Sequence, residues 1–103
     1  MEIYCNNKDL LNKAVDYSKK LGIDGYNAII SIKRLPPSFS QVGIIEHPLI
    51  LGKRTYLSIY VRLNKERYVT LAHEMVHARQ FLKGQTMCEK EAYLLENSLD
   101  NNP

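Results

Sequence analysis

Two histidines four residues apart, with a glutamate directly after the first, form the segment His73-Glu74-Met75-Val76-His77. In an α-helix, residues at i and i+4 lie one turn apart on the same face, so the two imidazoles can converge on one ion. Zn²⁺ favours imidazole nitrogens in a tetrahedral shell that keeps a position for water. Glu74 would then stand beside the ion, where its carboxylate can take a proton from zinc-activated water. The pattern predicts zinc-dependent hydrolysis, with His73 and His77 as ligands and Glu74 as general base.

A zinc site of this kind needs a third protein ligand, and no histidine follows His77. The glutamates of the next helical segment are the candidates, above all Glu89 and Glu91. These two border the apolar stripe of that segment from opposite sides, so at most one of them can face the histidines. The residues alone leave the choice between them open.

Two further side chains have types that can act in hydrolysis. Tyr93 lies one helical turn beyond Glu89 on the same side, where its hydroxyl can donate a hydrogen bond to a ligand or to an oxyanion. We therefore include Tyr93 among the candidate catalytic residues, with packing as the alternative role. His47 precedes Pro48 in an expected turn, and a turn histidine usually has neither a metal-binding nor a catalytic role.

Residues 73–80 (HEMVHARQ) followed by residues 89–93 (EKEAY) resemble the gluzincin clan of metallopeptidases. The short span is similar to the smallest members, the minigluzincins and related compact bacterial and phage proteins. The resemblance covers about residues 55–99 and implies that the third zinc ligand opens an ExxA segment. Glu89 fits that position, with Glu91 as its competitor. The resemblance also implies that the strand at 56–61 is an edge strand, which binds an extended peptide by strand addition.

The sequence departs from this clan at one position and from a related clan at two. Many gluzincins place an acidic residue that braces a zinc-binding histidine where this chain has Tyr93, so the residue that plays this part is unassigned. The metzincin pattern is excluded, because Gln80 and Lys83 stand where its glycine and third histidine belong.

Hydrophobic periodicity and turn residues predict three helices and three strands around this motif. Asn7 is a plausible N-cap of the first helix, and Gly22 and Gly84 are plausible stops for the first two. We expect an α+β fold, a minimal zincin-like domain with an N-terminal helix, a small three-stranded sheet, an active-site helix and a C-terminal glutamate helix. The helices are expected at residues 8–21, 66–83 and 87–99, and the strands at 26–33, 40–46 and 54–63.

Length and composition predict one ordinary globular domain over residues 1–103, expected as a monomer. No apolar run approaches the roughly 20 residues that span a bilayer, and the N-terminus lacks a signal-peptide layout. We therefore expect a cytoplasmic protein without a membrane partner, in which Cys5 and Cys88 are reduced. The net charge of +3 comes from scattered basic residues without a stripe, which argues against nucleic-acid binding.

The expected partner is a peptide or protein substrate, and three alternatives accompany this prediction. The protein can be a latent, zymogen-like or regulatory zinc-binding protein whose tail, residues 98–103, blocks the cleft. It can be an interaction module in which the histidines are incidental, and such a module would bind no stoichiometric zinc. It can also hydrolyse esters or other amides, because zinc-activated water attacks them by the same chemistry.

Overall fold

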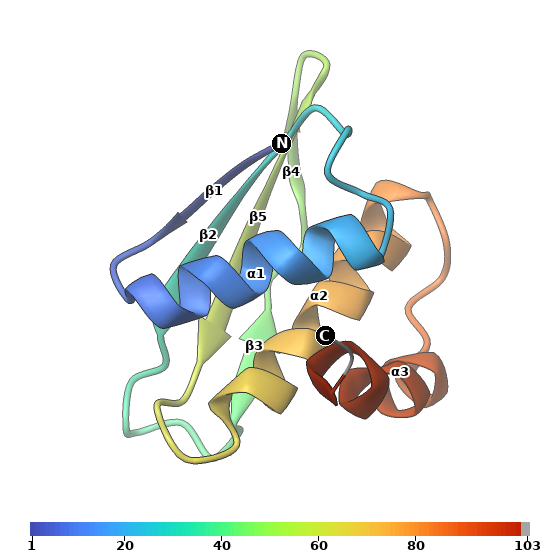
Figure 1. The fold of residues 1–103 in the computed structure, drawn as a ribbon. Coiled ribbons are helices and arrows are strands. Elements are labelled where there is room, and N and C mark those ends of the chain that lie inside the picture. Colours follow the sequence, from blue (N-terminus) through green and yellow to red (C-terminus); the bar gives the residue numbers. More distant parts are fainter. Residues whose placement is uncertain (102–103) are drawn as a thin grey trace.

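The computed structural model describes residues 1–101, which form a mixed sheet with three helices (Figure 1). The predicted α+β class is confirmed at this level. The expected tail residues Asn102 and Pro103 lie outside the described residues. The elements in chain order are β1 (Glu2–Cys5), α1 (Lys8–Lys20), β2 (Ala28–Arg34), β3 (Gly43–Ile45), β4 (Leu49–Leu51), β5 (Arg54–Val61), α2 (Arg67–Leu82) and α3 (Glu89–Asn101).

The sheet has five strands, so the prediction of three was wrong. Its order is β1-β2-β5-β3, with β4 pairing with β5 as well. The pairs β1–β2 and β2–β5 are parallel, whereas β3 and β4 run antiparallel to β5. The two strands missed from the sequence, β1 and β4, have four and three residues. Segments this short do not display a period that distinguishes a strand from a turn.

The strand β5 lies inside the sheet, and the expectation that it forms an edge was wrong. It pairs with β2 along one side, while β4 and β3 together occupy its other side. β4 pairs with the residues from Arg54 to Tyr56, and β3 pairs with those from Ile59 to Val61. The open edge on this side of the sheet is therefore formed by β3 and β4.

The helices cover one face of the sheet, and the core lies between these two layers (Figure 1). Alternate residues of the central strands, such as Ile30, Leu57 and Ile59, are buried toward the helices. This alternation is typical of a sheet that is covered on one face. α2 packs against β5 and β3 on one side and against α3 on another. Because α2 is enclosed in this way, it buries polar as well as apolar side chains.

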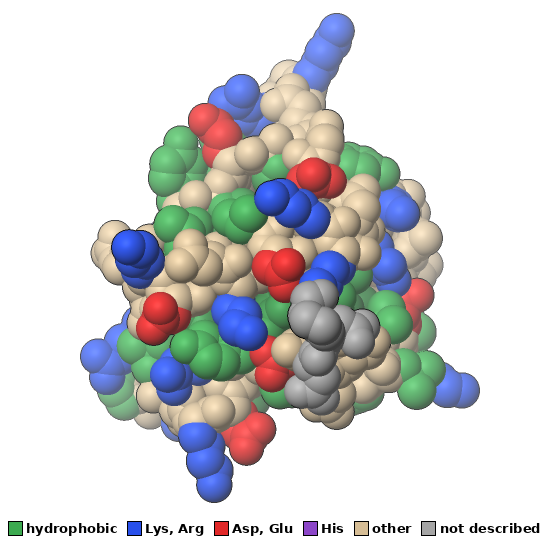
Figure 2. All heavy atoms as spheres, viewed as in Figure 1, with side chains coloured by type: hydrophobic (Ala, Val, Ile, Leu, Met, Phe, Trp, Pro, Cys, Tyr) green, Lys and Arg blue, Asp and Glu red, His purple; other side chains and the backbone are tan. Residues whose placement is uncertain are grey.

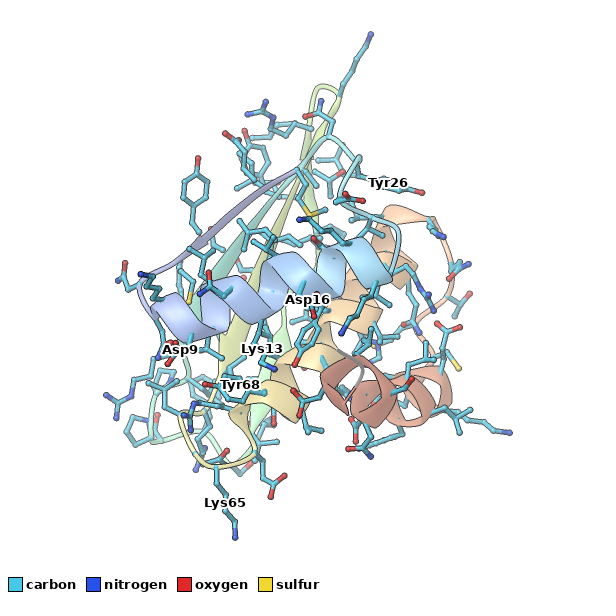
Figure 3. All side chains as sticks on the ribbon, in the orientation of Figure 1. Asp9, Lys13, Asp16, Tyr26, Lys65 and Tyr68 are labelled. Carbon is cyan, nitrogen blue, oxygen red and sulfur yellow. The ribbon has the colours of Figure 1, made fainter. Side chains whose placement is uncertain are left out.

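Charged side chains of both signs are interspersed over the face that carries α1 and α3 (Figure 2). On α1, Lys13 lies 5.3 Å above the ring of Tyr68, which belongs to α2 (Figure 3). In the described part of the chain, no helix has the length and apolar character needed to cross a membrane.

The C-terminal end of α3 is tied to α1 by polar contacts. The hydroxyl of Tyr17, which is fully buried, donates to Asp100 Oδ1 at 2.7 Å. Lys20 Nζ donates to the carbonyl of Leu99 at 3.2 Å, and Lys13 Nζ lies 3.6 Å from Asp100 Oδ1. Burial, followed by the hydrogen bond to Asp100, raises the pKa of Tyr17 well above its ordinary value, so its hydroxyl is a donor at any physiological pH. These contacts set the position of the far end of α3.

We predict that Tyr17→Phe lowers the free energy of unfolding by about 1–2 kcal/mol, because it removes a partly buried hydrogen bond to a carboxylate. Urea unfolding measures this change, and amide hydrogen exchange should accelerate in the last turns of α3. Tyr4→Phe is the matched control, because the hydroxyl of Tyr4 is in an exposed contact and its loss should cost less than about 0.5 kcal/mol. Equal effects of the two substitutions would contradict the anchoring role.

Candidate metal centre

The predicted motif lies in the middle of α2, and its helical spacing brings the side chains together. The ligand atoms of His73, Glu74 and His77 all lie within 4.8 Å of one another. His77 is 1% exposed and Glu74 is 6% exposed, so both are withdrawn from bulk water. The two imidazole rings are 4.9 Å apart, with an interplanar angle of 78°. This group can hold a metal ion.

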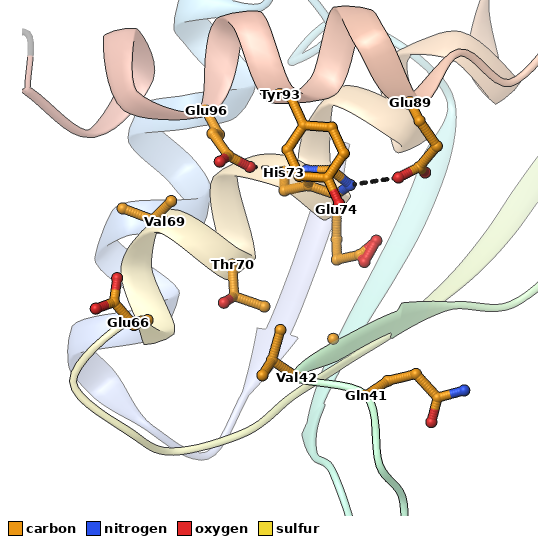
Figure 4. A pocket seen from close by; sticks show the side chains of 11 residues that line it. Gln41, Val42, Glu66, Val69, Thr70, His73, Glu74, Glu89, Tyr93 and Glu96 are labelled. Carbon is orange, nitrogen blue, oxygen red and sulfur yellow. Dashed lines mark hydrogen bonds and ion pairs between the residues drawn. The ribbon is translucent and has the colours of Figure 1, made fainter.

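Glu89, the first residue of α3, approaches both histidines, and its contact with His73 is drawn in Figure 4. Its Oε2 lies 3.3 Å from His73 Nε2, and its Oε1 lies 2.5 Å from His77 Nε2. Glu91 instead contacts Gln80 Nε2 at 2.9 Å and Arg79 at 3.3 Å. The structure thus places Glu89, and not Glu91, beside the two imidazoles.

The hydrogen bonding of the buried His77 ring indicates whether these residues fit a metal ion. Its Nε2 is buried and makes no hydrogen bond, although Glu89 Oε1 is close to it. A buried polar atom without a hydrogen-bond partner costs free energy unless another ligand satisfies it. Two imidazole nitrogens and one carboxylate that meet around one point are a donor set that Zn²⁺ accepts. The residues present therefore fit a divalent metal ion.

Each histidine is oriented by a partner on its other ring nitrogen. His73 Nδ1 lies 2.7 Å from Glu96 Oε2, and His77 Nδ1 lies 2.8 Å from Gln80 Oε1. Both partners accept a hydrogen bond, so Nδ1 carries the hydrogen and Nε2 keeps its lone pair for an ion. Neither role was predicted from the sequence. Glu96 could have been found as the residue seven positions after Glu89, which lies on the same face of an ideal helix.

Gln80 connects α2 to the start of α3. This side chain is 1% exposed, and its Oε1 accepts from the backbone N–H of Cys88 at 3.0 Å as well as from His77. Its Nε2 donates to the carbonyl of Cys88 at 3.1 Å and to Glu91 Oε1 at 2.9 Å. Because Cys88 immediately precedes Glu89, the same amide orients one imidazole and places the chain that delivers the carboxylate. The hydrogen bond from Gln80 is also the main reason why the pKa of Glu91 is lowered.

Glu74 is a carboxyl group without a hydrogen-bond or ion-pair partner among the described residues, held inside the site. Burial raises its pKa to about 7, an effect that His77 opposes and that Glu89 and Glu96 reinforce. A general base works best when its pKa lies near the operating pH. A divalent cation bound next to Glu74 would favour its ionised form.

A cleft of about 470 Å³ opens beside these residues, between α2, α3 and the segment that leads into β3 (Figure 4). Gly43 brings β3 very close to α2, because a Cβ added there would lie 2.5 Å from Thr70 Cγ2 and 3.3 Å from Glu74 Oε2. Any side chain at position 43 would push β3 away from α2. The absence of one lets the sheet edge form the wall of the cleft opposite Glu74.

The two remaining candidates have different surroundings. Tyr93 is 62% exposed and lines the cleft, with its ring 4.7 Å from the ring of His73 (Figure 4). His47 instead lies 6.3 Å from the ring of Phe81 and does not line the cleft. Tyr93 is thus brought to the candidate site, and His47 is not. Cys5 and Cys88 are free thiols.

We predict that the protein binds one zinc ion per chain and that His77→Ala and Glu89→Ala each abolish stoichiometric binding. Glu91→Ala is the matched control, because Glu91 contacts Gln80 and Arg79 rather than the histidines. Elemental analysis after dialysis against limiting zinc measures the content. Loss of the metal in Glu91→Ala but not in Glu89→Ala would contradict Glu89 as the third ligand. A native protein that binds no metal would support the alternative function, an interaction module in which the histidines are incidental.

We predict that Gln80→Leu weakens zinc binding about 10–100-fold, the usual effect of removing a partner that orients a ligand. The substitution leaves His77 Nδ1 without its acceptor and frees the backbone of Cys88. Competition with a chromophoric chelator measures the affinity. Gln85→Leu is the control, because Gln85 is exposed in the connection between α2 and α3. An unchanged affinity in Gln80→Leu would show that the amide does not position the ligands.

No family model, no curated protein and no solved structure matches this chain.

Proposed function

We propose that this chain is a zinc-dependent peptidase that hydrolyses peptide bonds with Glu74 as general base. The observation that carries the proposal is the convergence of the Nε2 atoms of His73 and His77 with the carboxylate of Glu89 beside the cleft, next to the buried carboxyl of Glu74. Among the described residues, the Nε2 of His77 makes no hydrogen bond. When bound, zinc would polarise the scissile carbonyl and lower the pKa of water. The side chains of the protein perform the remaining steps.

Glu74 lies beside the ligands and has no other partner among the described residues, which suits proton transfer. As water attacks the carbonyl carbon, the carboxylate of Glu74 takes its proton. The protonated carboxyl then delivers this proton to the leaving amine as the C–N bond breaks, which regenerates the carboxylate. The burial of Glu74 excludes bulk water, which strengthens its electrostatic interaction with the substrate.

The strand β3 can hold an extended substrate. The hydrogen bonds that flank its pairing with β5 run from Arg62 N–H to the carbonyl of Val42 and from Glu46 N–H to the carbonyl of Ser58. In an antiparallel pair this register directs the N–H and C=O groups of the alternate residues, Gly43 and Ile45, away from β5. A peptide that pairs with these groups would lie along the cleft. We therefore assign strand addition to β3, in place of the strand expected from the sequence.

Tyr93 is proposed to act on the substrate from the rim of the cleft. Its ring packs edge-on against His73, and its exposed hydroxyl is free to donate a hydrogen bond to the developing oxyanion. Together, an HExxH helix, a sheet edge beside it and a following glutamate helix support a minimal zincin-like layout. They also support the relationship to minigluzincins that the sequence motif suggests.

We predict that Glu74→Gln lowers kcat/KM for a quenched fluorescent peptide by about 10²–10⁴-fold, the range typical for removal of a general base. The zinc content should stay at one per chain, because the ligands are unchanged. Glu2→Gln is the control, since Glu2 lies in β1 at the opposite edge of the sheet. Removal of zinc by a chelator should abolish turnover in all three proteins.

Turnover that survives Glu74→Gln would refute the assigned base. Native protein that binds zinc but cleaves no peptide would support the latent zinc-binding alternative. Residues 98–101 belong to α3, and Asp100 is bonded to Tyr17 on α1. Cleavage that appears only after removal of residues 98–103 would therefore indicate inhibition by this end of the chain.

A further inference from the structure

Among the described residues, the Asp, Glu, Lys and Arg side chains that line the cleft of the candidate metal centre are all acidic, although the chain as a whole has a net charge of +3. Within residues 1–101, no lysine or arginine lines this cleft. Four carboxyl groups outweigh the charge of one divalent ion, and a low-dielectric cleft focuses the field that they produce. The acidic residues that line the cleft are Glu66, Glu74, Glu89 and Glu96.

Three of these four glutamates have a part in the proposed chemistry, and Glu66 has none. Glu89 reaches both imidazoles, Glu96 orients His73, and Glu74 is the buried carboxyl without a partner that points to a bound ligand. Glu66 stands at the N-cap of α2, but its side chain makes no capping hydrogen bond. Within residues 1–101 it forms no ion pair, and the neighbouring Lys65 extends away into solvent (Figure 3). Its carboxylate is therefore available to a ligand.

Two valine side chains and the threonine Thr70 separate Glu66 from the metal ligands. Val69 and Thr70 follow it on α2, and Val42 faces them from the segment before β3 (Figure 4). A long cationic side chain matches this arrangement, because its methylene stem packs on apolar surface while its head reaches a carboxylate. A neutral or acidic side chain of the same length would leave Glu66 without a partner or would be repelled by it.

We infer that the cleft selects substrates with a lysine or arginine near the scissile bond and that the Glu66 carboxylate forms an ion pair with this side chain. This inference rests on the proposed peptidase function. Glu66 and His73 are seven residues apart on one helix, which corresponds to a rise of about 10 Å. An extended peptide advances about 3.3 Å per residue, so the cationic residue lies within about three positions of the scissile bond. Glu66 is a specificity residue and takes no part in bond cleavage.

The test compares peptides that carry lysine or norleucine at one position, moved stepwise along both sides of the cleaved bond. Norleucine keeps the stem of lysine and removes the charge. At one position we expect lysine to be preferred about fivefold in kcat/KM, the effect of a partly exposed ion pair. The preference should shrink as salt is raised from 0.05 to about 0.5 M, since salt screens exposed charges.

Glu66→Gln should reduce the lysine-to-norleucine ratio to about one, and Glu66→Lys should make glutamate the preferred residue at that position. Glu2→Gln makes the same charge change at the opposite edge of the sheet and should keep the native ratio. The same peptides are also titrated against the zinc-loaded Glu74→Gln protein by fluorescence anisotropy. The ratio of dissociation constants then reports charge selection in the absence of turnover.

The two readouts separate failure of this inference from failure of the proposed function. A native ratio of one, or a ratio unchanged by Glu66→Gln, overturns the role of Glu66 while peptide cleavage stands. A native protein that cleaves no peptide overturns the proposed function. In that case a binding ratio that depends on Glu66 would still support selection of basic peptides by the cleft.

Discussion

The amide of Gln80 lies buried between α2 and α3, and the geometry of the candidate site depends on its four hydrogen bonds. Its partners are His77 Nδ1, both backbone groups of Cys88 and Glu91. If the buried amide lost these partners, each polar group left unpaired would destabilise the fold by its desolvation free energy. The four hydrogen bonds therefore stabilise this arrangement together. The turn that joins the two helices is consequently held where Glu89 meets the histidines.

The site draws on supports from both ends of α3. At its start, Gln80 is hydrogen-bonded to Cys88. About two turns further on, Glu96 orients His73, and at its end Asp100 accepts a hydrogen bond from Tyr17 on α1. A helix of 13 residues is thus attached to its neighbours near both termini and at an internal position. In a chain this small, such polar attachments supplement a modest apolar core. The position of the metal ligands is for this reason linked to packing that lies outside the cleft.

The cleft combines two requirements that act on the same residues. Metal binding and proton transfer both require carboxylates close to the imidazoles. These carboxylates make the cleft acidic, whether or not the protein selects basic substrates. Gly43 lets the edge of the sheet approach Glu74 closely enough to form the opposite wall. The backbone groups that β3 leaves unpaired then face the same space as the carboxylates. Binding of an extended basic peptide and hydrolysis of its backbone are compatible for this physical reason.

The sequence by itself determined what is local. The spacing of His73, Glu74 and His77 predicts their convergence because a helix repeats every 3.6 residues wherever it lies. Helix bounds, the α+β class and the alternation of buried residues in β5 follow from the same periodicities, and the structure departs from them by one or two residues at the helix ends. Tertiary structure decided between Glu89 and Glu91, because the choice depends on where α3 crosses α2. It also decided the interior position of β5 and the roles of Gln80 and Glu96, since strand pairing and contacts between helices join residues whose spacing along the chain carries no fixed geometry.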